Sequence, residues 1–111
     1  MKRIAVLGTG NIGTDLLIKL NKLGYKDIAF IGRRHNSEGI QTVKSLGIQT
    51  STDGINFFSN NNNFDVVFDC TNAFDAVYHY EVLKKLNIKA VSYTHLRAHE
   101  TGRNLVCRLL L

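Results

Sequence analysis

The sequence predicts an α/β domain built on a parallel sheet. Short apolar runs of strand length alternate along the chain with longer amphipathic stretches. This alternation is typical of right-handed strand–helix–strand units, which place parallel strands side by side. A glycine-rich segment also separates the first apolar run from the first amphipathic stretch. Together these observations favour a doubly wound sheet with the strand order 3-2-1-4-5.

The individual elements follow from local patterns. The strands are apolar and partly β-branched, whereas the helices carry apolar residues at helical spacing and end at glycine or asparagine. Asn72 is expected to cap the last helix, Thr52 or Asp53 the short one before it, and Asn60–Asn63 to form a surface loop. We expect strands at residues 1–7, 27–31, 48–50, 65–70 and 88–91, and helices at 11–23, 37–46, 53–58 and 73–86.

The segment Gly8–Gly13 lies between the first strand and the first helix and matches the pattern G-x-G-x-x-G. In this context the first glycine allows a sharp turn, the second leaves room for a pyrophosphate, and the third lets the helix pack closely on the sheet. The free amides and the dipole of the helix start favour phosphate. A glycine-rich turn in another α/β fold is the alternative. We predict a Rossmann-like domain that binds a dinucleotide through Gly8, Thr9, Gly10, Asn11, Ile12 and Gly13.

Two further segments are expected to face the same cleft. Because strands 1 and 4 diverge there, Asp69–Asn72 should lie opposite the glycine segment, with Thr71 at the cofactor. The second strand leads into Gly32-Arg33-Arg34, where a strict NAD site carries an acidic residue and an arginine accommodates a 2′-phosphate. Arg33 is therefore predicted to contact the cofactor, which leaves NADP open beside NAD. The alternative is that both arginines are solvated.

Four segments resemble the start of the acetylating acetaldehyde dehydrogenases. Gly8–Leu16 resembles the family's G-S/T-G-N-I-G-T-D-L, and Asp65–Ala73 resembles its D-I-V-F-D-A-T-S-A. Ser37–Ile40 is similar to S-D/E-G-L/I, and Leu46–Ile55 to L-G-V-x-T followed by E-G-I/V. The resemblance covers residues 2–90 and implies a cofactor-binding Rossmann domain that precedes a second, catalytic domain.

The resemblance implies NAD as the cofactor and a reaction in which acetaldehyde, coenzyme A and NAD give acetyl-CoA and NADH. In the family, a cysteine thiolate attacks the aldehyde, and that cysteine lies beyond the part resembled here. We therefore expect no catalytic residue in this chain and no turnover by the chain alone. The resemblance also implies a homo-oligomer, a complex with 4-hydroxy-2-oxovalerate aldolase, and a role in the catabolism of aromatic compounds.

Two other interpretations stay open. A different NAD(P)-dependent reductase, of the semialdehyde or dihydrodipicolinate type, would carry the same kind of domain, and Arg33-Arg34 favours it. A nucleotide-binding module without chemistry would also contain the glycine segment. The string Asn11–Asp15 and the segment Asp69–Ala73 favour the acetaldehyde dehydrogenase over both.

Residues 91–111 resemble translated sequencing-adapter DNA. Val91–Thr101 is similar to a transposase end with its primer site, and Asn104–Leu111 to a flow-cell primer, in that order and in one frame. Segments of this origin are excluded from fold reasoning. We therefore expect a truncated NAD(P)-binding Rossmann domain at residues 1–90 and a non-native tail at 91–111, and we assign no role to the histidines or the cysteine of that tail.

Composition narrows the remaining functions. The net charge of +5 fits scattered solvated lysines, and the two cysteines lack metal-ligand spacing. We expect no metal, no nucleic-acid partner, no membrane partner and a cytoplasmic location. Cys70 replaces an alanine of the family pattern and is expected to be a small buried residue. His35 is expected to be exposed, and His79 to lie on the outer face of its helix.

Overall fold

The computed structural model describes residues 3–8, 10–32 and 38–92. Its five strands are parallel and form one sheet in the order β3-β2-β1-β4-β5, which confirms the predicted doubly wound arrangement. The strands are β1 (Ile4–Leu7), β2 (Ile28–Ile31), β3 (Gln49–Ser51), β4 (Val66–Asp69) and β5 (Lys89–Ser92).

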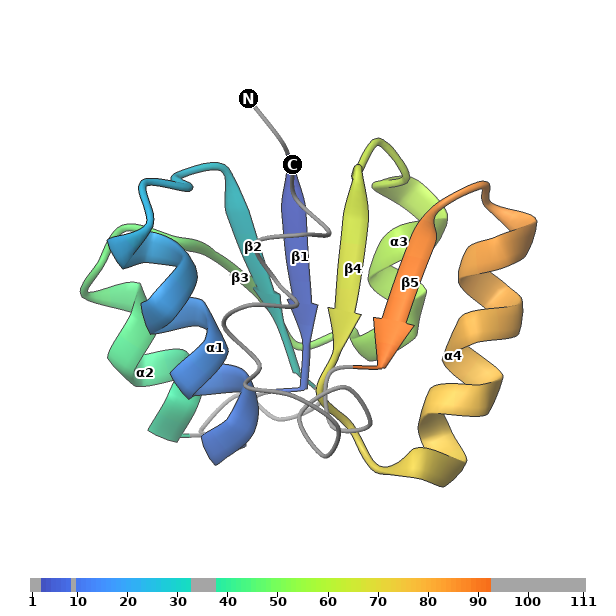
Figure 1. Ribbon diagram of the computed structural model, residues 1–111, viewed down its shortest axis with the longest axis horizontal. Helices are drawn as coiled ribbons and strands as arrows, with labels where there is room; N and C mark the ends of the chain where they lie inside the picture. Colours follow the sequence, from blue (N-terminus) through green and yellow to red (C-terminus); the bar gives the residue numbers. More distant parts are fainter. Residues whose placement is uncertain (1–2, 9, 33–37, 93–111) are drawn as a thin grey trace.

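Helices cover both faces of this sheet (Figure 1). All strands run in one direction, so the loops that follow β1 and β4 leave the sheet at the same edge (Figure 1). One face carries α1 (Asn11–Lys22) and α2 (Glu38–Lys44), and the other carries the 3-10 turn η1 (Gly54–Asn56), α3 (Phe57–Asn60) and α4 (Ala73–Lys85).

The central strands supply both cores because successive side chains of a strand point to opposite faces. Ile4 and Val6 of β1 belong to the core beneath α1 and α2, and Ala5 and Leu7 belong to the core beneath α3 and α4. β1, β2 and β4 are buried along their whole length, as parallel strands covered on both faces are. Each fully buried Leu, Ile or Phe contributes about 1.5–3 kcal/mol to stability. The sheet is therefore a rigid base for the loops at its carboxyl edge.

Both ends of α4 are closed by local contacts. The side-chain oxygen of Asn72 accepts a hydrogen bond from the Asp75 amide at 2.8 Å, which confirms the predicted N-cap of α4. At the other end Asn87 takes a positive φ of 60° and its amide donates to the Lys84 carbonyl. These contacts fix where α4 begins, and hence where the β4–α4 turn must end.

Two details differ from the sequence-based expectation. Asp53 precedes η1, but its side chain makes no capping hydrogen bond. Asn60 closes α3 instead of opening a loop, and the Asn61 side chain donates to the Phe57 carbonyl at 3.0 Å. β5 runs from Lys89 to Ser92, close to the strand predicted at 88–91, and so extends two residues past residue 90. Strand pairing uses backbone groups alone, so the pairing of these two residues with β4 is independent of their origin.

At the amino edge of the sheet, Arg3 contacts the segments that precede β2 and β4. Its amide donates to the Asp65 carboxylate at 2.7 Å, its guanidinium lies 3.6 Å from Asp27, and that group stacks 4.4 Å from the centre of the Phe64 ring.

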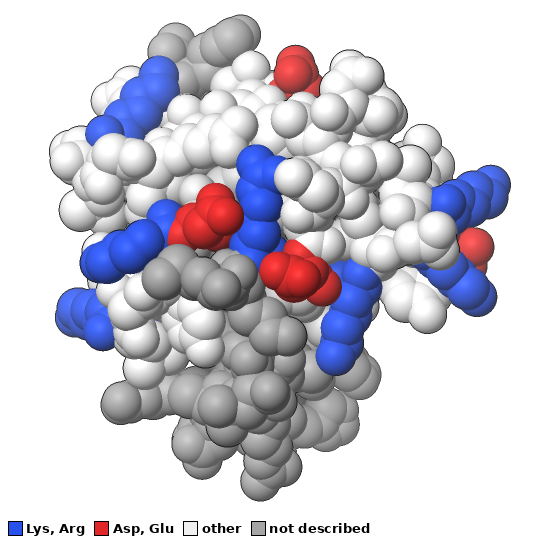
Figure 2. Space-filling model, turned by 90° about the horizontal axis from the view of Figure 1, so that it is seen from above, with Lys and Arg blue, Asp and Glu red and all other residues white. Residues whose placement is uncertain are grey.

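On the face seen from above, basic side chains lie scattered among acidic and uncharged ones (Figure 2). No helix within the described ranges has the length and apolar character needed to cross a bilayer.

Candidate functional site

The segment after β1 packs directly on the segment after β4. Gly8 has a φ of 111°, and its amide donates to the Ile31 carbonyl at 2.8 Å. A β-carbon on Gly8 would lie 2.9 Å from the Cys70 carbonyl carbon and 3.2 Å from the Thr71 nitrogen. Both the positive φ and the missing space therefore require glycine at this position.

The other two glycines of the motif have opposite surroundings. A β-carbon on Gly13 would lie 1.9 Å from the Gly8 carbonyl oxygen, so α1 approaches the loop as closely as its backbone allows. Among the described residues, a β-carbon on Gly10 would meet no atom within 4 Å. Gly10 is the N-cap residue of α1, with φ −76° and ψ −167°, and it makes no side-chain capping hydrogen bond to the amides that follow it. Gly10 thus leaves open space in front of the helix start.

The structure brings most of the predicted cofactor residues to one edge of the sheet. Gly8, Gly10, Asn11 and Gly13 surround the start of α1, and Thr71 lies against Gly8. Asn11 is exposed, whereas the Ile12 side chain packs on the core, so Ile12 offers a ligand only its backbone. Thr9 and Arg33, and with them Arg34 and His35, lie outside the described residues. That these residues bind a cofactor stays a prediction.

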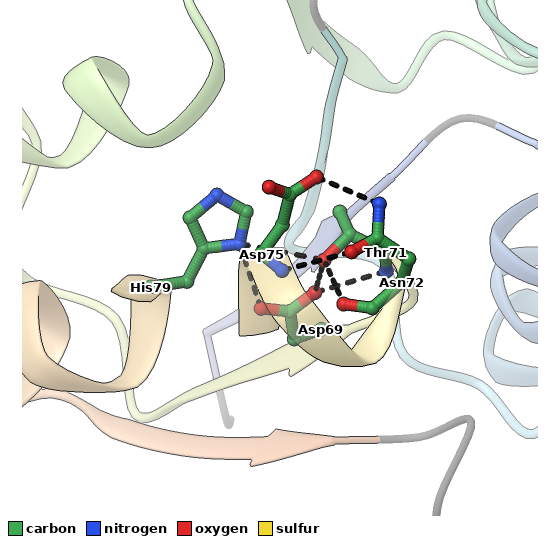
Figure 3. Close-up of polar contacts among 5 residues, drawn as sticks. All are labelled: Asp69, Thr71, Asn72, Asp75 and His79. Carbon is green, nitrogen blue, oxygen red and sulfur yellow. Dashed lines mark hydrogen bonds and ion pairs between the residues drawn. The ribbon is translucent and has the colours of Figure 1, made fainter. Parts of the chain in front are cut away.

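A buried carboxylate organises the turn after β4 (Figure 3). Asp69, the last residue of β4, is 3% exposed. One of its oxygens accepts the Thr71 amide at 2.9 Å and also the Thr71 hydroxyl. Its other oxygen lies 2.8 Å from Nδ1 of His79, which comes from α4 (Figure 3). Nδ1 must be the protonated nitrogen to donate to a carboxylate. Both Asp69 oxygens are therefore satisfied without water.

The expectation for His79 is wrong. His79 is 9% exposed and faces the sheet, while its neighbours Phe74 and Tyr78 are 88% and 61% exposed. The prediction rested on the absence of a visible partner for His79 in the sequence. The competing requirement is that a buried carboxylate needs donors. The signal that sequence reasoning missed was Asp69 itself, an acidic residue at the end of an entirely apolar strand.

Cys70 is half-buried and carries no nucleophilic character. Burial, with a smaller contribution from the Asp69 carboxylate, raises the pKa of its thiol to about 12. The thiolate is the nucleophilic form of cysteine, so Cys70 stays protonated and inert at neutral pH. Its side chain packs against the core beneath α1 and α2, as a small apolar residue does.

The fold and the glycine loop define a Rossmann-type domain. The structure superposes on scyllo-inositol dehydrogenase from Lactobacillus casei, solved with bound NAD(H) and scyllo-inositol, with a TM-score of 0.63 and 10% sequence identity. The match covers 99% of this chain and 34% of that protein. At this identity the likeness shows the fold.

The sequence matches acetaldehyde dehydrogenases. It is 42% identical to the enzyme of Spirochaeta aurantia and 43% identical to acetaldehyde dehydrogenase 2 of Salinispora arenicola, each over 94 residues and 83% of this chain. No family model matches the chain. Over the matched stretch this chain is a homologue of the acetaldehyde dehydrogenases, as its motifs predicted, and it spans about a third of their length.

Proposed function

We propose that this domain binds a nicotinamide dinucleotide over the Gly8–Gly13 loop and serves as the cofactor domain of an acylating acetaldehyde dehydrogenase. The observation that carries the proposal is the open space at Gly10, framed by two glycines that admit no side chain. Gly10 has a φ of −76°, so its backbone conformation does not require glycine, and the missing side chain is what a pyrophosphate at the helix start would need. The homology to acetaldehyde dehydrogenases supports the choice of enzyme.

The start of α1 suits the pyrophosphate. The first amides of a helix have no partners within the helix, and its dipole places positive partial charge there. No side chain of the described residues caps those amides, and Gly10 brings no β-carbon between them and a ligand. The amides of Asn11 and Ile12 would hold the phosphates, with Thr71 across the cleft. NAD is the working cofactor, and NADP is tolerated.

In the proposed enzyme this domain presents the cofactor, and the bound nicotinamide would accept hydride. Acetaldehyde and coenzyme A are the substrates, with acetyl-CoA and NADH as products. The protonated state of Cys70 supports a nucleophile elsewhere in the enzyme. A homo-oligomer, a complex with 4-hydroxy-2-oxovalerate aldolase, a cytoplasmic location and a role in aromatic catabolism belong to the same proposal.

A Gly10→Val variant tests the loop. Its β-carbon meets no atom of residues 3–8, 10–32 and 38–92 within 4 Å, and the φ of −76° is one that valine adopts, so the variant should fold. The side chain would instead occupy the space of the pyrophosphate. We expect calorimetric titration with NAD to show binding weakened by about tenfold or more, which is about 1.4 kcal/mol.

The matched control is Asn62→Val, which places the same side chain on an exposed loop that precedes β4. This variant should bind NAD as the unmodified chain does. Equal NAD affinity of Gly10→Val and the unmodified chain, with both folded, would show that the loop is not the cofactor site.

A further inference from the structure

We infer that His79 is a positioning residue for the cofactor cleft: it holds the Asp69 carboxylate and thereby fixes the Thr71 turn against the glycine loop. The inference rests on the proposed function for its consequence in binding. It starts from an independent observation, which is that a buried histidine of α4 is bonded to a buried carboxylate at the end of β4 (Figure 3).

The Asp69 carboxylate, at the end of β4, links Thr71 in the following turn to His79 on α4. One oxygen takes both donors of Thr71, and the other takes Nδ1 of His79 at 2.8 Å. Thr71 Oγ1 also lies 3.4 Å from that nitrogen. Without His79, one oxygen of a 3% exposed carboxylate would lose its donor. A buried charge in that position must rotate toward another donor or draw in water, and either change disturbs Thr71.

The turn held in this way touches the glycine loop directly. A β-carbon on Gly8 would lie 3.2 Å from the Thr71 nitrogen, so the turn and the glycine loop are in backbone contact. The next residue, Asn72, is fixed separately by its bonds to Asp75. The turn is therefore held from both sides, by Asp69 before it and by the cap after it. Among the described residues, the hydrogen bond of His79 to Asp69 is the one that comes from beyond the first turn of α4.

Two substitutions separate the hydrogen bond from mere packing. In His79→Asn the side-chain amide nitrogen is attached to Cγ, as Nδ1 is, so it can donate to Asp69 from the same place. In His79→Leu a side chain of similar size carries no donor. We expect His79→Leu to weaken NAD binding roughly tenfold, the ratio that corresponds to about one charge-assisted hydrogen bond, and His79→Asn to bind nearly as the unmodified chain does.

A second measurement needs no cofactor. The Thr71 amide donates to Asp69, so its hydrogen exchange should be slow in the unmodified chain and in His79→Asn, and faster in His79→Leu. Nitrogen-15 shifts of the imidazole should show a protonated Nδ1. Leu83→Val is the matched control. Leu83 is a fully buried α4 residue in the core beneath α3 and α4, so its truncation lowers stability without removing a donor to Asp69.

The outcomes are distinct. Unchanged Thr71 exchange in His79→Leu, or the same loss of protection and of binding in Leu83→Val, would overturn the positioning role. Absence of NAD binding by the unmodified chain would overturn the proposed function alone. The exchange of the Thr71 amide in the two His79 variants would then still decide whether His79 fixes the turn.

Discussion

A β-carbon built on Gly13 would lie 1.9 Å from the carbonyl oxygen of Gly8, so these two glycines pack backbone against backbone. Gly10, between them in sequence, has open space where they have contact. The glycines of the motif therefore have two different roles. Gly8 and Gly13 allow the loop to fold, and Gly10 is the position where we propose that the pyrophosphate lies.

Gly13→Ala should destabilise the protein. The added methyl group meets backbone, which cannot move aside as a flexible side chain would, so α1 must shift from the loop. We expect a loss of about 1–3 kcal/mol in the free energy of unfolding, measured by urea titration. Gly10→Ala is the comparison and should change stability by roughly 1 kcal/mol or less. Equal losses in the two variants would contradict the division between folding and ligand space.

Cys70 should react slowly with iodoacetamide. To isolate it, the measurement uses the Cys107→Ser chain. Because burial raises its pKa to about 12, the thiolate is scarce at pH 8, and alkylation should run roughly a thousandfold slower than that of an ordinary cysteine. The rate should rise about tenfold per pH unit up to that pKa, as long as the protein stays folded. Fast alkylation of the folded chain at pH 8 would show an accessible thiolate.

The same raised pKa makes stability depend on pH. The folded state keeps the Cys70 proton where the unfolded chain, with the ordinary pKa of 9.0, has lost it. The contribution of Cys70 is therefore fully present below pH 9.0 and is lost as the pH rises toward about 12. We expect Cys70→Ser to lose less stability than the parent chain between those values in urea titrations. Parallel pH profiles of the two proteins would refute the raised pKa.

The 111-residue chain should not oxidise acetaldehyde. Its described cysteine is protonated, and in the proposed enzyme the nucleophile lies elsewhere. With acetaldehyde, coenzyme A and NAD present, absorbance at the NADH band should stay at the level of a blank. Formation of NADH that needs both substrates and disappears in Cys70→Ser would assign the chemistry to this chain.

Cofactor choice should follow the family, with NAD bound at least as tightly as NADP. A well-made arginine–phosphate contact contributes about 1.5–3 kcal/mol, or roughly ten- to a hundredfold in affinity, whereas solvated arginines contribute little. Arg33→Ala and Arg34→Ala should therefore leave the ratio of the two dissociation constants nearly unchanged. Tighter binding of NADP, lost in either variant, would show that the loop after β2 decides the cofactor.

The order of the strands, the faces that they bury and the position of the glycine loop were predictable from the sequence by itself. Each depends on spacing within a short segment: apolar runs at strand length, helical periodicity, and glycines between a strand and a helix. The strand order 3-2-1-4-5 follows from the doubly wound fold class that the glycine loop indicates. The predicted Asn72 cap was equally local, because its partner Asp75 lies in the same turn.

The pairing of Asp69 with His79 was decided by the tertiary structure. It depends on how α4 is rotated against the sheet, and the apolar pattern of α4 points the wrong way, since Phe74 and Tyr78 face outward. An argument about burial that uses one helix alone takes only the hydrophobicity of its residues into account. The carboxylate that the histidine must satisfy sits on β4, ten residues earlier. Only the packed structure brings donor and acceptor together, because a buried carboxylate needs hydrogen-bond donors and its nearest partner lies on another element.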